Sequence, residues 1–216
     1  MGTGRAHQST SSTAFWAGRL LLMALAVFVV THAVWAYPKP RTVPTRWELE
    51  FVPGVLRLYT DVSSGRSYWY FTYEVVNTTG EDQLWFPSFT LYTDGGEILD
   101  SGDDVPYSIT RKIRDYVGSD YMLVHSDVIG TLRQGRGHAR EGLVIWPANQ
   151  LDLTELSLFI GGISGERATV VNPLNGDRIS LQKTMQRNYL VPGNLVPRSD
   201  RPIELDPDNP EQWIFR

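Results

Sequence analysis

The sequence contains no cysteine and little histidine. Disulfide bonds, zinc–thiolate sites and thiol catalysis are therefore excluded. The four histidines show neither His-x-x-x-His nor His-Glu-x-x-His spacing, and no Gly-x-Ser-x-Gly segment is present. These absences argue against zinc hydrolase chemistry and against the nucleophile turn of α/β-hydrolases. The sequence therefore predicts no cofactor.

Basic residues are fewer than acidic ones, with 20 Lys and Arg against 24 Asp and Glu. Loss of residues 1–36 would remove Arg5 and Arg19 and no acid, which leaves 18 basic and 24 acidic side chains and a net charge of −6. An acidic surface repels phosphate backbones, so we predict no nucleic-acid partner.

The N-terminus shows the pattern of an export signal. An unbroken apolar run, Leu20–Val30, leads to a small residue at Ala36. This pattern predicts cleavage between Ala36 and Tyr37. The alternative is a retained signal anchor over Leu20–Ala36, which has about the minimum length for a spanning helix. Either way, residues 37–216 are predicted to be periplasmic, displayed at the cell surface or secreted, with membrane contact only through residues 20–36 if they are retained.

The segment Ser67–Asp94 is the centre of the predicted fold. Two runs rich in aromatic and β-branched residues flank a polar turn that contains glycine. This arrangement predicts a β-hairpin. In the first run, strand alternation places Trp69 and Phe71 on one face and Tyr68 and Tyr70 on the other.

Short strands and turns continue along the rest of the chain. Further strands are expected at Arg46–Val52, around Leu56 and Leu58, at Ile98-Leu99, Met122–His125, Val128–Leu132, Leu143–Trp146, Leu156–Ile160, Ala168–Val171 and Arg178–Met185. Pro53-Gly54 is expected to end the first of these strands, whereas Asp94–Glu97 and Asn175-Gly176 are expected to form hairpin turns.

Apolar residues recur at helical spacing only over about residues 105–117, which predicts one short helix, Pro106–Tyr116, followed by Gly118. Many short strands with one helix predict an all-β fold of the β-sandwich type, with a small barrel as the alternative. The predicted domain covers residues 46–190. A linker with three prolines, residues 37–45, precedes it, and an extended proline-rich tail, residues 191–216, follows it.

Three stretches resemble a family of bacterial envelope domains with an immunoglobulin-like fold. They are Phe71–Asp82, Phe89–Gly96 and Leu132–Ile145, which contain strand and turn motifs. In addition, Asn172–Leu181 is similar to a segment of uncharacterised secreted proteins from planctomycete-type bacteria. The resemblance implies an immunoglobulin-like β-sandwich. It implies no activity, because packing and turn motifs specify a fold and not a function.

Outward-facing aromatic side chains suggest one candidate site. Tyr68, Tyr70 and Trp85 could stack on sugar rings if they face solvent, whereas the competing interpretation places such side chains in the core or in cross-strand pairs. An apolar segment, Trp213-Ile214-Phe215, lies near the end of the tail. It is expected either to dock on the domain or to enter a partner protein.

An acidic loop suggests a calcium site formed by Asp100, Asp103 and Asp104, because calcium prefers oxygen ligands on flexible loops. The competing interpretation is that these residues form turns and a helix cap. Similarly, Asn77-Thr78-Thr79 matches the N-glycosylation sequon, but we interpret Asn77 as a turn residue.

These observations support three hypotheses about function. The favoured one is a non-enzymatic exported domain that mediates protein interaction or envelope architecture. The second is a carbohydrate-binding or cell-wall-binding module that uses the outward aromatic residues and has a polysaccharide as its partner. The third is an envelope hydrolase that uses His125 with Asp127 or Asp120, although residues adjacent on a strand point to opposite faces.

Overall fold

Strands dominate the protein in the computed structural model, which describes residues 37–119, 121–191, 193 and 201–216. From Pro38 to Arg216 the chain forms one compact unit. The predicted signal segment lies outside the described residues, as do Ala36 and Asp120. Among the helices that the structure describes, none has the length and apolar character to span a membrane.

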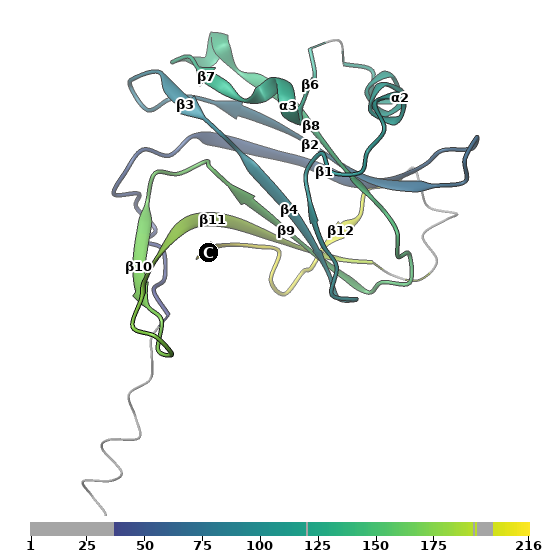
Figure 1. The fold of residues 1–216 in the computed structure, drawn as a ribbon. Coiled ribbons are helices and arrows are strands. Elements are labelled where there is room, and N and C mark those ends of the chain that lie inside the picture. Colours follow the sequence, from purple (N-terminus) through teal and green to yellow (C-terminus); the bar gives the residue numbers. More distant parts are fainter. Residues whose placement is uncertain (1–36, 120, 192, 194–200) are drawn as a thin grey trace, which may run out of the picture. The chain divides into compact units, whose positions relative to one another are not determined.

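Two stacked sheets form the body of this unit (Figure 1). In the order of pairing, the first sheet contains β1 (Glu50–Thr60), β2 (Ser67–Val76), β8 (Arg140–Pro147) and β6 (Leu123–Val124). The second sheet contains β10 (Arg167–Val171), β11 (Arg178–Leu190), β9 (Glu155–Gly161), β4 (Ser88–Thr93) and β5 (Ile98–Asp100), and β12 (Glu204–Leu205) and β13 (Glu211–Phe215) also pair with β11. A separate ladder joins β3 (Gln83–Trp85) to β7 (Gly130–Leu132). The prediction of an all-β fold with stacked sheets is therefore confirmed.

Helical segments lie on the outer side of the first sheet (Figure 1). They are α2 (Tyr107–Val117) and α3 (His125–Val128), and the 3-10 turn η1 (Arg136–His138) precedes β8 in the chain. The helix predicted at Pro106–Tyr116 is confirmed within one residue at each end, and Gly118 ends it in the left-handed conformation. The prediction of a single helix missed α3, because four residues are too few to show helical periodicity.

The main core lies between the two sheets. Its fully buried side chains include Trp69, Phe71, Trp146, Phe89, Leu91 and Leu158. The ring of Tyr73 stacks against both Phe51 and Phe89, with ring centroids 5.1 Å and 4.8 Å away, and these two rings are themselves 6.3 Å apart. Gly142 lies opposite Tyr73 in the β2–β8 ladder, and a Cβ atom at Gly142 would lie 2.0 Å from Tyr73 Cζ. Only glycine therefore fits at this position beside the aromatic stack.

A second, smaller core separates the first sheet from α2. It consists of Tyr68, Tyr70, Ile109, Ile113, Met122, Leu143 and Ile145. The alternation predicted for β2 holds, since Trp69 and Phe71 face the main core while Tyr68 and Tyr70 face α2. Both faces of β2 are consequently buried.

The hairpin predicted across Ser67–Asp94 is wrong. Strand β2 pairs with β1 and β8 in the first sheet, whereas β4 pairs with β5 and β9 in the second. The fully buried Asn77 fixes the corner between them, because its Nδ2 donates 2.8 Å hydrogen bonds to the carbonyl oxygens of Glu81 and Leu132. The turn therefore carries the chain from one sheet to the other. The burial of Asn77 agrees with its interpretation as a turn residue.

Pro53-Gly54 does not end a strand, contrary to the prediction. Strand β1 continues through both residues, and its register against β2 shifts between Pro53 and Leu56. Because β1 is an edge strand, proline at this position breaks no central ladder. Gly54 fits closely, since a Cβ atom there would lie 2.4 Å from Thr72 Oγ1.

The two other predicted hairpins are confirmed. The turn at Asp94–Glu97 joins β4 to β5, and the turn that contains Asn175-Gly176 joins β10 to β11. Gly176 has φ of 78°, which favours glycine. Strand β11 runs on to Leu190, past the predicted end at Met185, because β9 and the C-terminal segment continue to pair with it.

The C-terminal segment forms backbone hydrogen bonds with β11 of the second sheet and with β1 of the first sheet. In β11, Met185 pairs with Ile160 of β9 and with Trp213 of β13, so β9 and β13 lie on opposite sides of this strand. The backbone N–H of Ile203 donates a 2.8 Å hydrogen bond to the carbonyl oxygen of Leu56 in β1. The described part of the predicted tail thus contributes strands to the sandwich.

A buried lysine connects four segments of the chain. Lys183 of β11 is 1% exposed, and its Nζ lies 2.8 Å from Glu48 Oε2 and 3.5 Å from Glu166 Oε2. The same atom lies 4.6 Å from the ring centroid of Trp213 in β13. Charge pairing and the aromatic face together compensate the loss of hydration that burial of an ammonium group causes.

A second ion pair anchors α2 to the turn between β1 and β2. Lys112 Nζ donates a 2.6 Å hydrogen bond to Asp61 Oδ1, and the hydroxyls of Ser63 and Ser64 donate to Asp61 Oδ2. These hydrogen bonds, that of Lys112 first, hold the pKa of Asp61 well below its ordinary value of 3.8.

Asp61→Asn is expected to reduce the loss of stability on acidification. Since folding lowers the pKa of Asp61, the carboxylate stabilises the fold above its ordinary pKa, and this contribution is lost as the pH falls through the folded-state value. Urea unfolding from about pH 5 to about pH 2 should therefore show a steeper fall for the wild type than for the variant. Asp152→Asn, at an exposed carboxylate, is the matched control. Equal slopes for the wild type and Asp61→Asn would contradict the assignment.

Candidate functional site

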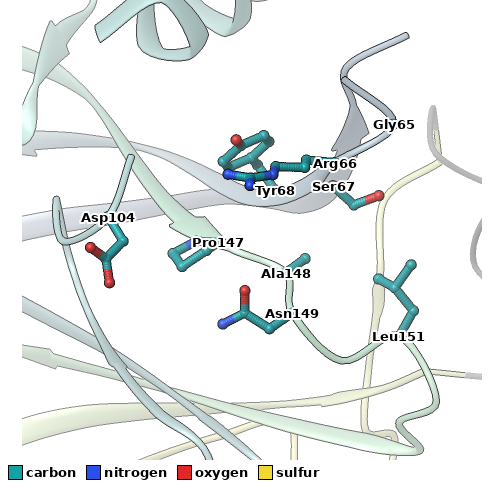
Figure 2. Close-up of a pocket in the computed structure, with 9 residues that line it drawn as sticks. All are labelled: Gly65, Arg66, Ser67, Tyr68, Asp104, Pro147, Ala148, Asn149 and Leu151. Atoms are coloured by element: carbon teal, nitrogen blue, oxygen red, sulfur yellow. The ribbon is translucent and has the colours of Figure 1, made fainter. Parts of the chain in front are cut away.

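A cavity of about 530 Å³ opens where three loops meet beside the end of β8 (Figure 2). Its walls come from the turn before β2, the loop before α2 and the segment that follows β8. The side chains that define it are Arg66, Tyr68, Asp104, Pro147, Asn149 and Leu151. The volume lies within the usual range for ligand sites, about 300–1,000 Å³.

Polar groups of both charges line this cavity without pairing with each other. Arg66, Asp104 and Asn149 are exposed, and none of the ion pairs between described residues includes Arg66 or Asp104. Figure 2 shows Arg66 beside Tyr68 on one wall and Asp104 on another. Leu151 and Pro147 add apolar surface. A charged ligand could therefore pair with these groups without breaking an ion pair of the folded protein.

The backbone at Asp104 is strained. Its φ of 54° makes it the sole described residue other than glycine in the left-handed region. A non-glycine residue there costs about 1–3 kcal/mol, and such residues cluster at functional sites. Asp104 is also one of the residues that line the cavity.

Sequence reasoning found one of the three polar residues and missed two. Asp104 was expected to bind calcium, whereas Arg66 and Asn149 were not predicted as site residues. Turn signals precede both, namely Ser64-Gly65 and Pro147. No spacing in the sequence connects them, because the fold brings three distant loops together.

A second pocket, of about 290 Å³, contains the residues of the hydrolase hypothesis. Ser126 Oγ donates a 3.1 Å hydrogen bond to Asp127 Oδ1, and no hydrogen bond between described residues joins His125 to either of them. Burial lowers the pKa of His125, whose ring packs edge-on against Phe89 with centroids 6.1 Å apart. The proposed partner Asp120 lies outside the described residues. The described side chains thus lie close together without forming a proton relay.

Tyr68, Tyr70 and Trp85 do not face solvent, so the candidate sugar-binding site is wrong and the competing interpretation, burial in the core, is confirmed. Their exposed fractions are 3%, 2% and 0%. Tyr68 and Tyr70 pack under α2, and Trp85 belongs to the main core. Sugar rings cannot stack on these side chains, because they are buried. The sequence did not show this, since strand alternation identifies the two faces of a strand and not what covers each face.

The acidic loop does not gather its carboxylates. Asp100 accepts a 2.9 Å hydrogen bond from Thr90 Oγ1, while Asp103 and Asp104 are exposed. Asp94 accepts hydrogen bonds from the hydroxyl and backbone N–H of Thr154, which lower its pKa. Within the described residues, no group of three acidic or histidine side chains is arranged to hold a metal ion. The geometry therefore does not support the calcium hypothesis.

The apolar end of the tail lies on the domain. Trp213, Ile214 and Phe215 belong to β13, which pairs with β11, and Phe215 is 4% exposed. Of the two alternatives for this segment, the structure shows docking on the protein's own sheet.

Comparison with family models, with curated proteins and with solved structures gave no match to this chain. The assignment of a function therefore depends on the geometry described above.

Proposed function

We propose that residues 37–216 form an exported, non-enzymatic β-sandwich domain that binds another protein of the cell envelope. The observation that carries this proposal is the cavity lined by Arg66, Asp104 and Asn149, which presents a guanidinium and a carboxylate that have no ion-pair partner among the described residues. Loops held by a rigid sandwich are common sites of recognition. The export pattern and the resemblance to immunoglobulin-like envelope domains support the same conclusion.

The chemistry of the cavity indicates the kind of partner. Arg66 can hold a carboxylate through two parallel hydrogen bonds, and Asp104 can accept a cationic group. The amide of Asn149 can both donate to and accept from a peptide backbone. A partner loop with one acidic and one basic side chain satisfies all three groups. Such an interface gains specificity more than affinity from its charges.

Reversal of one charge tests this proposal. For the full chain carrying Arg66→Glu, the yield of cross-linked envelope partner is expected to fall at least about tenfold. The new glutamate then faces the acidic side chain of the partner, and the two like charges repel each other. The matched control is Arg178→Glu, which changes an exposed arginine at the β10–β11 turn. Cross-linking in envelopes of the source organism, followed by quantification of the linked partner, provides the measurement. Equal cross-linking by both variants, or no partner for the wild type, would overturn the proposal.

A further inference from the structure

The pocket of about 290 Å³ between α2, α3 and β8 is a site of a different kind. Its floor is apolar, since Leu143 and Ile145 of β8 are 1% and 5% exposed and Val105 and Val124 complete it. The volume lies just below the usual range for drug-sized ligands, about 300–1,000 Å³. A ligand with a compact apolar body therefore fits this floor.

One negative charge lines the pocket. Asp127 is exposed and accepts a hydrogen bond from Ser126, while none of the ion pairs between described residues includes it. Lys112, on the helix that forms the opposite wall, is already paired with Asp61 at 2.6 Å. The carboxylate of Asp127 therefore remains available to a cation from solution.

An aromatic ring lines the same pocket as this carboxylate. Tyr107, the first residue of α2, lines the pocket and is 74% exposed, although tyrosine rings usually bury much of their surface. The faces of tyrosine rings attract cations. His125 adds no competing charge, because burial lowers its pKa and favours the neutral imidazole.

We propose that this pocket binds a small organic cation, namely an ammonium group attached to a compact apolar body. The ammonium group pairs with Asp127 and lies against Tyr107, and the apolar body covers Leu143 and Ile145. An anion is repelled by Asp127, and a neutral analogue makes the apolar contacts alone. The pocket shares no lining residue with the cavity at Arg66, although the loop before α2 contributes to both. Substitutions of Asp127 and of Arg66 therefore test the two proposals independently.

Three probes of nearly equal size test the proposal on the full chain: benzylammonium, benzyl alcohol and benzoate. Ligand-observed NMR titration is expected to give a dissociation constant of about 1 mM for benzylammonium, as its few non-hydrogen atoms allow. Benzyl alcohol should bind about tenfold more weakly, and benzoate should show no binding, because Asp127 distinguishes the three charges.

Two substitutions identify the residue responsible. Asp127→Asn should weaken benzylammonium binding about tenfold and leave benzyl alcohol binding unchanged. Asp115→Asn, which changes an exposed carboxylate elsewhere on α2, should alter neither. If Asp127→Asn fails to fold, Tyr107→Ala provides a second test. It should weaken the binding of benzylammonium more than the binding of benzyl alcohol. Equal binding of all three probes, no binding of benzylammonium, or no effect of a folded variant would overturn the proposal.

Discussion

Lys183→Met is expected to lower the free energy of unfolding by about 3 kcal/mol. The substitution preserves the apolar stem and removes the ammonium group that pairs with Glu48 and Glu166. Loss of one partner from a buried ion pair typically costs about 3–5 kcal/mol, since a charge is left buried and unpaired. We expect the lower end because the side chain of Glu48 remains 24% exposed. Urea unfolding at neutral pH measures the change.

Two comparisons separate the charge effect from packing. Lys39→Met, at an exposed position before β1, should change stability by less than about 0.5 kcal/mol. Lys183→Met combined with Glu166→Gln should be more stable than Lys183→Met alone, because the second substitution removes one unpaired carboxylate. A loss below about 1 kcal/mol for Lys183→Met would show that the ion pairs contribute little to the fold.

Gly142→Ala is expected to cost about 3 kcal/mol, the upper part of the usual range for overpacking. A Cβ atom at this position would lie 2.0 Å from Tyr73 Cζ and 2.3 Å from its hydroxyl oxygen. The ring cannot move aside easily, because Phe51 and Phe89 stack on it and Trp85 meets it edge-on. Thermal and urea unfolding should both detect the loss.

Gly137→Ala is the matched control for this substitution. No atom lies within 4 Å of a Cβ built at Gly137, and its φ is outside the positive region. Its stability should therefore remain within about 0.5 kcal/mol of the wild type. A smaller side chain at position 73 should relieve the clash, so Gly142→Ala with Tyr73→Leu should cost less than the sum of the two single changes. Additive costs would contradict the proposed contact.

Local sequence signals predicted the elements whose determinants lie within a few residues. The glycines at positions 95, 96 and 176 specify hairpin turns, and the spacing of Ile109 and Ile113 specifies the buried face of α2. In each case the residues that determine the structure are neighbours in the chain. Contacts with the rest of the protein then add stability without changing the element.

Signals that depend on distant residues were misread. The turn after β2 resembles a hairpin loop, but Asn77 bonds to Leu132, 55 residues away, and this contact directs the chain out of the first sheet. Similarly, the outer face of β2 carries Tyr68 and Tyr70, and only the position of α2 determines that they are buried. Turn signals identify where a chain reverses and not which strands become neighbours.

The candidate sites illustrate the same limit. Asp104 and Asp127 were noticed in the sequence because of their chemistry. Asp104 was assigned to a calcium site whose carboxylates the fold does not gather, and Asp127 was assigned to a relay with His125, which lines the same pocket without a hydrogen bond to it. Their actual neighbours include Arg66 and Tyr107, which come from other loops and from α2. A pocket is a property of several segments, so residue type alone reveals its members only in part.

The position of β13 has a consequence for when the protein can fold. Strand β11 can pair with β13 only after residues 211–215 have been synthesised. The same pairing places the ring of Trp213 over Lys183. Glu48, which pairs with that lysine, is made more than 130 residues earlier. A chain that emerges from the ribosome at about 5–20 residues per second adds the 30 residues from Lys183 to Trp213 in about 2–6 s, and the lysine is uncovered during this time. Native structure in the second sheet is completed only after synthesis has passed residue 215, so until then one side of β11 lacks its neighbour β13.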